Sequence, residues 1–274
     1  MTPRKLLQQV GIERSEAELL LAHLLEVDRG WLIAHADEPL DDRRAGMFLT
    51  QAEVRAKGEP LAYLLGYRDF WTLRLRVSRD VLIPRRETEH LVEWALECID
   101  AGAQTALDLG TGSGAVALAC KAERPAIRIT GVDLSQQALL CARENSRSLA
   151  LEVDWRQGDW FQAVPETRWD LVVSNPPYIA ANDVHLTQGD LPAEPDTALV
   201  AGNTGLEAIE QIIEQAPQAL NAAAWLLIEH GYDQAEAVTE LLRSTGFQHV
   251  RTRQDWSHQA RITGGQWLNS QTGN

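Results

Sequence analysis

The amino-acid sequence predicts an α/β protein, in which a doubly wound, mostly parallel sheet follows a small helical domain. Two observations carry this prediction. From about Glu87 onward, short apolar runs alternate with helical stretches, which is the pattern of strands buried between two layers of helices. Over residues 1–70, apolar residues recur at helical spacing instead. The chain has 274 residues, which is enough to bury one large core and a second small one.

Residues 1–70 are expected to form a domain of short helices. Ser15, followed three residues later by Glu18, has the spacing of a capping box, and leucines then recur at helical spacing. Further helices are expected from about Asp41 to Lys57, and from Pro60 to Leu65 with Gly66 as the stop.

Residues 71–86 are predicted to be a β-hairpin that links two domains. Apolar and polar residues alternate from Trp71 to Val77, which is the period of a strand with one buried face. Ser78-Arg79-Asp80 is a turn signal that would return the chain through residues 81–83. The segment carries five arginines and one acidic residue, and these arginines either contact an acidic patch on a protein partner or form a solvated strand face.

Residues 87–274 are expected to hold the sheet. Buried parallel strands are predicted at 105–109, 127–132, 151–156, 171–174 and 225–229, and helices between them at 115–122, 136–146, 206–220 and 234–244. The last two apolar runs, 247–253 and 259–268, have no helix between them. They are therefore expected to form an antiparallel pair at one edge of the sheet.

Composition excludes several classes of protein. The net charge of −14 repels phosphate backbones, so direct binding of nucleic acid is not expected. Three cysteines, Cys98, Cys120 and Cys141, are too few and too widely spaced for a disulfide framework or a metal site. No segment approaches the ~18 uninterrupted apolar residues of a membrane span. These features predict a cytoplasmic protein without membrane association or a bound metal, and we expect a monomer.

A glycine-rich turn follows the first predicted strand of the sheet. Its glycines have the spacing G-x-G-x-G, directly after Asp108, and its residues are Gly110, Thr111, Gly112, Ser113 and Gly114. Such a turn lets the backbone and the start of the next helix approach a ligand. Asp133 ends the next strand, where a carboxylate can accept both hydroxyls of a ribose, and Trp160 is placed to stack on an adenine. The spacing favours S-adenosylmethionine over a dinucleotide, and Asp108 and the five residues of the turn are candidate cofactor contacts.

A second motif, Asn175-Pro176-Pro177-Tyr178, follows the predicted strand 171–174 and so lies at the mouth of the sheet. Two prolines stiffen this loop, which can hold an amide and a carbonyl in fixed positions. If the Asn175 oxygen and the Pro176 carbonyl accept the two N–H bonds of a planar NH2 group, its lone pair faces a methyl donor at ~3 Å. Tyr178 would pack over the acceptor group. These residues predict amino methylation, with adenine, cytosine and glutamine as possible targets.

The chain resembles the HemK-like family of bacterial protein methyltransferases, which modify a glutamine of peptide chain release factors. The resemblance runs nearly end to end through motifs at 58–63, 66–71, 81–85, 108–114, 175–178 and 194–195. It implies a class I S-adenosylmethionine-dependent methyltransferase domain with seven strands, and a helical domain that binds the release factor. It also implies that Gly110–Gly114, Asp133, Trp160 and Asn175 contact the cofactor, and that Asn175–Tyr178 hold the glutamine of a Gly-Gly-Gln motif.

Two positions depart from the family pattern. Arg86 stands where a second proline is usual, and the 190–195 segment lacks an Arg-Phe pair, which leaves any charge contact from that loop open. The chain also carries its own Gly-Gly-Gln at 264–266, which we expect to be a coincidence within an edge strand.

Two alternatives remain at the level of sequence. A DNA or RNA amino-methyltransferase would use the same loop, but it needs a basic groove, whereas residues 87–274 hold 11 basic and 26 acidic side chains. A non-catalytic adaptor would have no need of both Asn175 and Asp133.

Overall fold

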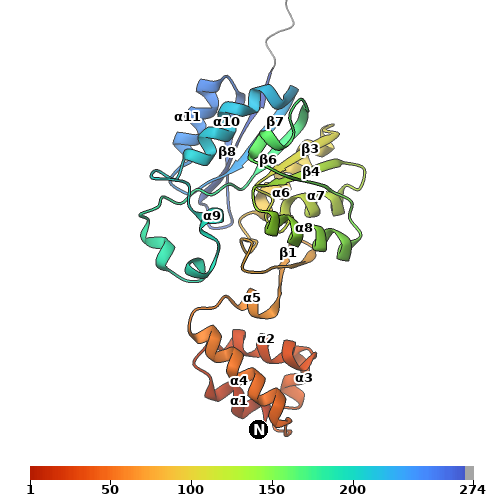
Figure 1. Cartoon of the computed structure of the whole chain (residues 1–274), viewed down its shortest axis with the longest axis vertical. Helices are drawn as coiled ribbons and strands as arrows, with labels where there is room; N and C mark the ends of the chain where they lie inside the picture. The colour runs from red at the N-terminus through yellow and green to blue at the C-terminus, as the bar shows by residue number, and fades with distance from the viewer. Residues whose placement is uncertain (269–274) are drawn as a thin grey trace, which may run out of the picture. The chain divides into compact units, whose positions relative to one another are not determined.

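The computed structural model describes residues 1–268, which divide into two compact units (Figure 1). The helical unit comprises residues 1–67 together with 187–193. The sheet unit comprises the other described residues. No helix within residues 1–268 is long and apolar enough to cross a membrane.

The helical unit has its own apolar core. Its helices are α1 (Pro3–Gln9), α2 (Arg14–Leu25), α3 (Arg29–Ala34), α4 (Asp42–Ala56) and α5 (Leu61–Leu65). Leu20, Leu21 and Phe48 are fully buried in this core. Asp41 caps α4 by accepting a hydrogen bond from the Arg44 N–H at 2.9 Å. The predicted helices at 41–57 and 60–65 are confirmed, and Gly66 ends α5 in the left-handed conformation.

The predicted capping box at Ser15 is wrong. Helix α2 begins at Arg14, so Ser15 lies inside its first turn, and Glu13 occupies the N-cap. The Ser15 hydroxyl donates to the Glu13 carboxylate instead of capping the helix. Glu18 accepts hydrogen bonds from Arg14, at 2.7 Å, and from Arg29. Ser15 and Glu18 therefore bond to charged side chains and not to the backbone at the start of the helix.

A distant segment completes the helical unit. The Arg55 guanidinium donates to the Glu16 carboxylate at 2.8 Å and to the Asp190 carboxylate at 3.0 Å. Asp190 lies 135 residues away in the sequence, within the short segment 187–193. The loop whose charge contacts were left open by the sequence therefore does form an ion pair.

The predicted hairpin has a different register. The small sheet pairs β1 (Tyr67–Phe70) with β2 (Leu73–Arg76), and the turn between them contains Trp71 at φ 55°. The expected return strand at residues 81–83 is not formed, so this part of the prediction is wrong. Val81 and Ile83 are buried there without strand pairing. Their apolar character therefore reflects burial and does not indicate a strand.

The main sheet has seven strands in the order β5-β4-β3-β6-β7-β9-β8. Neighbouring strands from β5 to β7 are parallel, and β9 is antiparallel to both β7 and β8. The strands are β3 (Thr105–Leu109), β4 (Arg128–Asp133), β5 (Asp154–Gln157), β6 (Trp169–Ser174), β7 (Leu220–Glu229), β8 (Gln248–Gln254) and β9 (Ala260–Trp267). The predicted parallel strands and antiparallel pair are confirmed, although β7 begins five residues before the expected start and β5 begins three residues after it.

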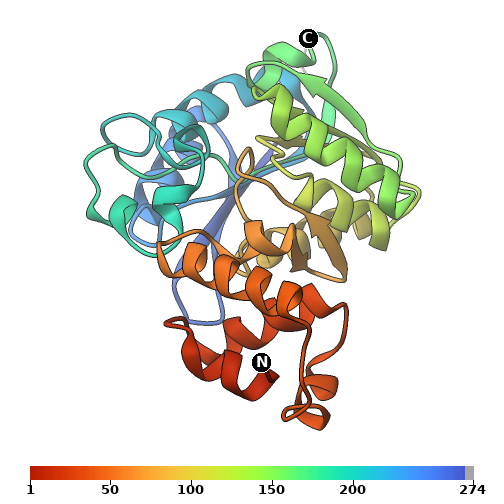
Figure 2. The same cartoon turned by 60° about the horizontal axis from the view of Figure 1, so that its bottom comes forward.

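Helices cover both faces of this sheet. They are α6 (Glu89–Asp100), α7 (Ala115–Glu123), α8 (Gln136–Leu149), α10 (Glu207–Ala219) and α11 (Ala235–Thr245). The chain also forms the short helix α9 (Asp196–Leu199). One core packs α6, α7 and α8 on the sheet, and a second packs α10 and α11. In Figure 2 the yellow-green helices of residues 115–149 and the blue helices of 207–245 lie on opposite sides of the sheet. The predicted doubly wound fold is confirmed.

The Gly-Gly-Gln tripeptide of this chain lies in β9, which is an interior strand and not the expected edge strand. A Cβ on Gly264 would lie 2.5 Å from Leu227 and 2.9 Å from Trp94, and one on Gly265 would lie 2.9 Å from Phe247. Packing therefore requires both glycines. This accounts for the tripeptide without any role as a methylation target.

Replacing Gly264 with alanine is expected to lower the free energy of unfolding by about 1–3 kcal/mol, because the methyl group overpacks a closed core. Urea denaturation of the sheet unit measures this change. Gly46→Ala is the control: a Cβ at Gly46 meets nothing within 4 Å, and the residue lies inside α4, so no loss is expected. A Gly264→Ala protein as stable as wild type would contradict the packing explanation.

Candidate active site

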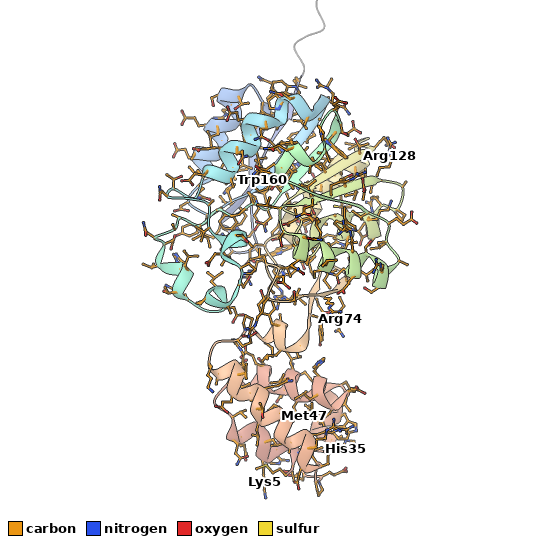
Figure 3. The ribbon with its side chains drawn as sticks, viewed as in Figure 1. Lys5, His35, Met47, Arg74, Arg128 and Trp160 are labelled. Carbon is orange, nitrogen blue, oxygen red and sulfur yellow. The ribbon has the colours of Figure 1, made fainter. Side chains whose placement is uncertain are left out.

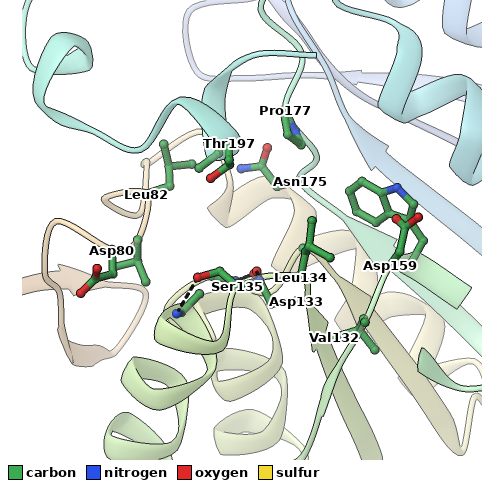
Figure 4. Close-up of a pocket in the computed structure, with 17 residues that line it drawn as sticks. Asp80, Leu82, Val132, Asp133, Leu134, Ser135, Asp159, Asn175, Pro177 and Thr197 are labelled. Carbon is green, nitrogen blue, oxygen red and sulfur yellow. Dashed lines mark hydrogen bonds between the residues drawn. The ribbon is translucent and has the colours of Figure 1, made fainter. Parts of the chain in front are cut away.

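A cavity of about 450 Å³ lies at the carboxyl ends of β3, β4 and β6, within the sheet unit. In an open parallel sheet, neighbouring strands whose connections run in opposite directions leave a crevice at their carboxyl ends, and ligands bind in that crevice. Figure 4 shows Asp133 and Leu134 toward the lower part of the view and Asn175 and Pro177 above them. The cavity therefore brings together the ends of strands that are far apart in the sequence.

The glycine-rich turn forms one wall. Gly110, Gly112 and Gly114 have φ values of 71°, 55° and 83°, a region that disfavours other residues. Gly110 and Gly112 line the cavity. Gly114 instead packs inward, where a Cβ would lie 2.8 Å from Trp155. The first two glycines give a ligand access to the backbone, and the third lets α7 start close to the sheet.

Four predicted cofactor contacts do not line this cavity: Asp108, Thr111, Ser113 and Gly114. Asp108 is buried behind the turn, where its carboxylate accepts hydrogen bonds from the Thr111 hydroxyl at 2.6 Å and the Ala117 N–H at 3.2 Å. Burial raises the pKa of Asp108 to about 6. These residues shape the turn, and their direct contact with a cofactor stays a prediction.

Asp133 ends β4 and lines the cavity. Its Oδ2 accepts the Gly112 N–H and its Oδ1 accepts the Ser135 N–H, both at 2.8 Å. Burial raises the pKa of this carboxyl group. Each oxygen of a carboxylate has about two acceptor sites, so two remain for the hydroxyls of a ligand. The two backbone bonds hold the carboxylate in place before a ligand arrives.

Trp160 supplies the flat side of the cavity. Its half-buried indole, labelled in Figure 3, donates from Nε1 to Gln211 Oε1 at 3.2 Å. A Cβ on Gly110 would meet the indole at 3.4 Å, so the ring packs against the glycine turn. A ring held in this way can stack on a planar base.

Sequence reasoning missed a further wall, formed by Asp80, Val81 and Leu82 and by Thr197 and Ala198. Glu194 holds these two segments together, because its carboxylate ion-pairs with Arg85 and accepts the Ile83 N–H at 3.2 Å. The motifs at 81–85 and 194–195 were recognised only as family signatures. Their physical role could not be inferred, since nothing in the sequence pairs residues 111 positions apart.

Acidic residues of the chain itself pair with at least three of the five arginines in residues 71–86. Arg74 pairs with Asp69 at 2.8 Å, Arg76 with Glu144 at 3.1 Å, and Arg85 with Glu194. The expectation that these arginines contact a partner is therefore weakened for these three. The structure gives no explanation for the arginine at position 86.

The Asn175 loop lies opposite Asp133. It leaves β6 after Ser174, whose hydroxyl donates to the Leu109 carbonyl at 2.8 Å and so ties β6 to β3. Asn175 Nδ2 donates to Thr88 Oγ1 at 3.1 Å. Asn175 and Pro177 line the cavity.

Pro176 and Tyr178 complete the loop, and the predicted contact of the Pro176 carbonyl with a substrate group stays a prediction. Pro176 is buried, and neither residue lines the cavity. The Tyr178 ring packs against the core under α10 and α11, and burial raises the pKa of its hydroxyl. Its carbonyl accepts a hydrogen bond from Gln234 Nε2 at 3.0 Å. The predicted contact of Tyr178 with a substrate group stays a prediction.

His230, which follows β7, serves packing. His230 is buried, with Nε2 bonded to the Thr263 hydroxyl and Nδ1 to the Gly231 carbonyl, both at 2.8 Å. Over residues 1–268, no group of three or more His, Cys, Asp or Glu side chains is arranged to hold a metal ion.

Comparison with known proteins identifies the family. The family model "Methyltransferase small domain" matches residues 90–190, and the "PrmC N-terminal domain" model matches residues 4–66. The release factor glutamine methyltransferase of Xylella fastidiosa strain 9a5c is 48% identical over 256 residues, 93% of each chain. That of Aliivibrio fischeri is 40% identical and spans 97% of this chain and 96% of its own. The chain belongs to the release factor glutamine methyltransferase family.

Solved structures agree on the fold of this family. The catalytic domain of human Mettl16, solved with an RNA hairpin, aligns with a TM-score of 0.58 at 16% identity, over 84% of each chain. The 16S rRNA methyltransferase RsmC of T. thermophilus, solved with AdoMet and guanosine, aligns with a TM-score of 0.52 at 18% identity, over 73% of this chain and 49% of its own. At such identities the likeness extends to the fold alone.

Proposed function

We propose that this chain transfers a methyl group from S-adenosylmethionine to the side-chain amide nitrogen of the glutamine in the Gly-Gly-Gln motif of peptide chain release factors. The curated relatives are named for glutamine methylation of release factors and match nearly the whole chain. The observation that carries the mechanism is that Asn175 and Asp133 line the same cavity at the carboxyl edge of the sheet.

The cavity suits S-adenosylmethionine, which supplies an electrophilic methyl group when bound. Asp133 has two free acceptor sites for the hydroxyls of a ribose. The Trp160 indole offers a face for an adenine, and Gly110 and Gly112 leave room for close approach to the backbone. The cavity of about 450 Å³ falls within the range of small-molecule sites.

The amide nitrogen of glutamine is a weak nucleophile, because its lone pair is delocalised. The Asn175 oxygen and the Pro176 carbonyl would accept its two N–H bonds and aim the lone pair at the methyl donor. The same acceptors favour the positive charge that develops on nitrogen. The methylated nitrogen is acidic enough to lose its proton to water, so no strong base is needed.

The helical unit would supply contacts to the release factor. In this proposal residues 1–70 bind the partner, residues 71–86 link the domains and residues 87–274 carry out methyl transfer. The alternative of a DNA or RNA substrate is not favoured, because the chain carries a net charge of −14 and its close relatives are named for a protein substrate. A monomeric state and a cytoplasmic location stay predictions.

Incubation with labelled S-adenosylmethionine and a purified release factor tests this function. We expect label on the glutamine of the Gly-Gly-Gln peptide, located by mass. A release factor with that glutamine replaced by alanine should take up no label. Label on nucleic acid alone would overturn the proposal.

Replacing Asp133 with alanine is expected to weaken S-adenosylmethionine binding at least tenfold. Each hydrogen bond to a charged group contributes about 1.5–3 kcal/mol, and a tenfold change in Kd needs only about 1.4 kcal/mol. Calorimetry measures the change. Because Asp133 also holds the backbone at Gly112 and Ser135, circular dichroism must show an intact fold. Asp133→Asn, which keeps the shape, should bind more tightly than the alanine variant, and wild-type affinity in the alanine variant would remove Asp133 from the site.

A further inference from the structure

A chain of buried polar groups lies behind the Asn175 loop. Asn175 Nδ2 donates to Thr88 Oγ1 at 3.1 Å, and hydrogen bonding by the Thr88 hydroxyl favours the ionised form of the Glu229 carboxyl group and so lowers its pKa. Thr88 is 4% exposed and Glu229 is 1% exposed. Glu229 Oε2 is buried with no hydrogen-bond partner within the described chain. A buried carboxylate with so few partners is costly to the fold, so its presence points to another role.

The pairing of two adjacent strands brings these groups together. Strands β6 and β7 are adjacent and parallel, and Ser174 lies opposite Ile228, so Asn175 and Glu229 follow at the same level of the carboxyl edge. Thr88 occupies the N-cap of α6, yet its side chain makes no capping hydrogen bond. A threonine at this position commonly caps its helix. Here the hydroxyl serves Asn175 and Glu229 instead.

The direction of this hydrogen-bond chain determines which end of the Asn175 amide faces the cavity. An ionised carboxylate can only accept hydrogen bonds. When the single hydrogen of the Thr88 hydroxyl goes to Glu229, Oγ1 can only accept from Asn175. It therefore holds the NH2 end of the amide and leaves Oδ1 for the cavity.

We propose that Thr88 and Glu229 are positioning residues for methyl transfer, which orient the Asn175 amide so that its oxygen and not its NH2 group meets the target nitrogen. The inference rests on the proposed role of Asn175 as an acceptor. A reversed amide would present two donors to a substrate group that itself donates, and the productive complex would be lost.

The charge state of Glu229 controls this direction. Burial raises the pKa of Glu229 to about 7. The other charged and titratable groups around it are Arg261 from β9, Arg85 and Glu87 ahead of α6, Tyr178 after β6, and the adjacent His230. Burial lowers the pKa of His230 and raises that of Tyr178, so both are neutral near pH 7.

Protonation of Glu229 would therefore let the amide turn round. The protonated carboxyl can donate to Thr88, whose hydroxyl can then donate to Asn175 Oδ1. We expect kcat to rise with pH through about 7, as Glu229 loses its proton. The free energy of unfolding should change in the opposite direction to kcat. The folded state holds this proton more tightly than the unfolded chain does, so the free energy of unfolding falls as the pH rises from 4.5 through about 7.

Thr88→Val and Thr88→Ser test the hydroxyl. The valine variant keeps the shape and removes the hydroxyl, so we expect kcat for release factor methylation to fall about 10- to 100-fold. Its KM for release factor and its Kd for S-adenosylmethionine should stay within about twofold of wild type. Thr88→Ser restores the hydroxyl and should keep kcat within about threefold. A valine variant at the wild-type rate, or a serine variant as slow as valine, overturns the inference.

Glu229→Gln separates positioning from structure. At pH 8 the uncharged side chain should raise Tm, because it removes a buried charge, while kcat falls at least about fivefold. The rise of kcat between pH 6 and pH 8 should disappear. If Glu229 had only a structural role, kcat would change in the same direction as Tm. If the pH dependence of kcat persists in Glu229→Gln, Glu229 is not the titrating group.

A double-mutant cycle distinguishes this inference from the proposed function. If Thr88 acts through Asn175, Thr88→Val should have no further effect in an Asn175→Ala background. Equal loss from Thr88→Val in both backgrounds contradicts positioning while the role of Asn175 stands. A wild-type rate for Asn175→Ala alone contradicts the proposed role of Asn175 itself.

Discussion

Replacing Asn175 with alanine is expected to lower kcat for release factor methylation by about 10²–10³-fold. This is the size of effect seen when one oriented polar partner is removed from a transition state. The variant loses the acceptor at the mouth of the cavity and also the hydrogen bond to Thr88. Single-turnover measurement of methyl transfer, with the enzyme in excess over release factor and S-adenosylmethionine at saturation, reports the chemical step directly.

Asn175→Asp is the sharper variant at this position. It keeps an acceptor of nearly the same shape and should retain more activity than alanine if acceptance of a hydrogen bond is what matters. It also loses the donor to Thr88 and adds a negative charge near Glu229, so its rate should remain below wild type. Binding of release factor should survive in both variants. Wild-type turnover by Asn175→Ala would show that this loop does not position the substrate.

The parts of the fold that could be predicted are those whose pattern is local. Residues 105–109 are rich in apolar side chains, as expected of a parallel strand buried on both faces, and β3 has these bounds. The start of β7 could not be predicted, since the alanines at 222–224 favour a helix while sheet pairing extends the strand back to Leu220. Helix α6 was missed although Leu91, Trp94 and Cys98 recur at helical spacing.

The same division applies to the cavity. Gly110, Asp133 and Asn175 could be placed together because each follows a strand of one parallel sheet, whose carboxyl ends meet at one edge. Leu82 and Thr197 could not, since loops bring them to the cavity and a buried carboxylate, Glu194, joins those loops. The roles of Thr88 and Glu229 could not be predicted either, because an isolated threonine and a glutamate at a strand end belong to no recognisable motif.

Removal of residues 1–66 is expected to reduce kcat/KM for a folded release factor at least about 100-fold, while the affinity for S-adenosylmethionine stays near wild type. A 100-fold loss corresponds to about 2.8 kcal/mol of interface free energy. The cut belongs before Tyr67 and not at residue 70, because Phe70 is 1% exposed in the core of the sheet unit and β1 pairs with β2. The sheet unit keeps both of its own cores after this cut.

A short peptide that carries Gly-Gly-Gln supplies the control. The peptide reaches the cavity without a folded surface to bind the helical unit, so full-length and truncated chains should methylate it at equal, slow rates. The loss of the Arg55–Asp190 ion pair is tested separately by Arg55→Ala in the full chain, which should leave peptide methylation unchanged. If the truncated chain methylates release factor as fast as the full chain, residues 1–66 do not bind the substrate. If it fails on the peptide as well, the helical unit contributes to the catalytic site, and its assignment to partner binding is wrong.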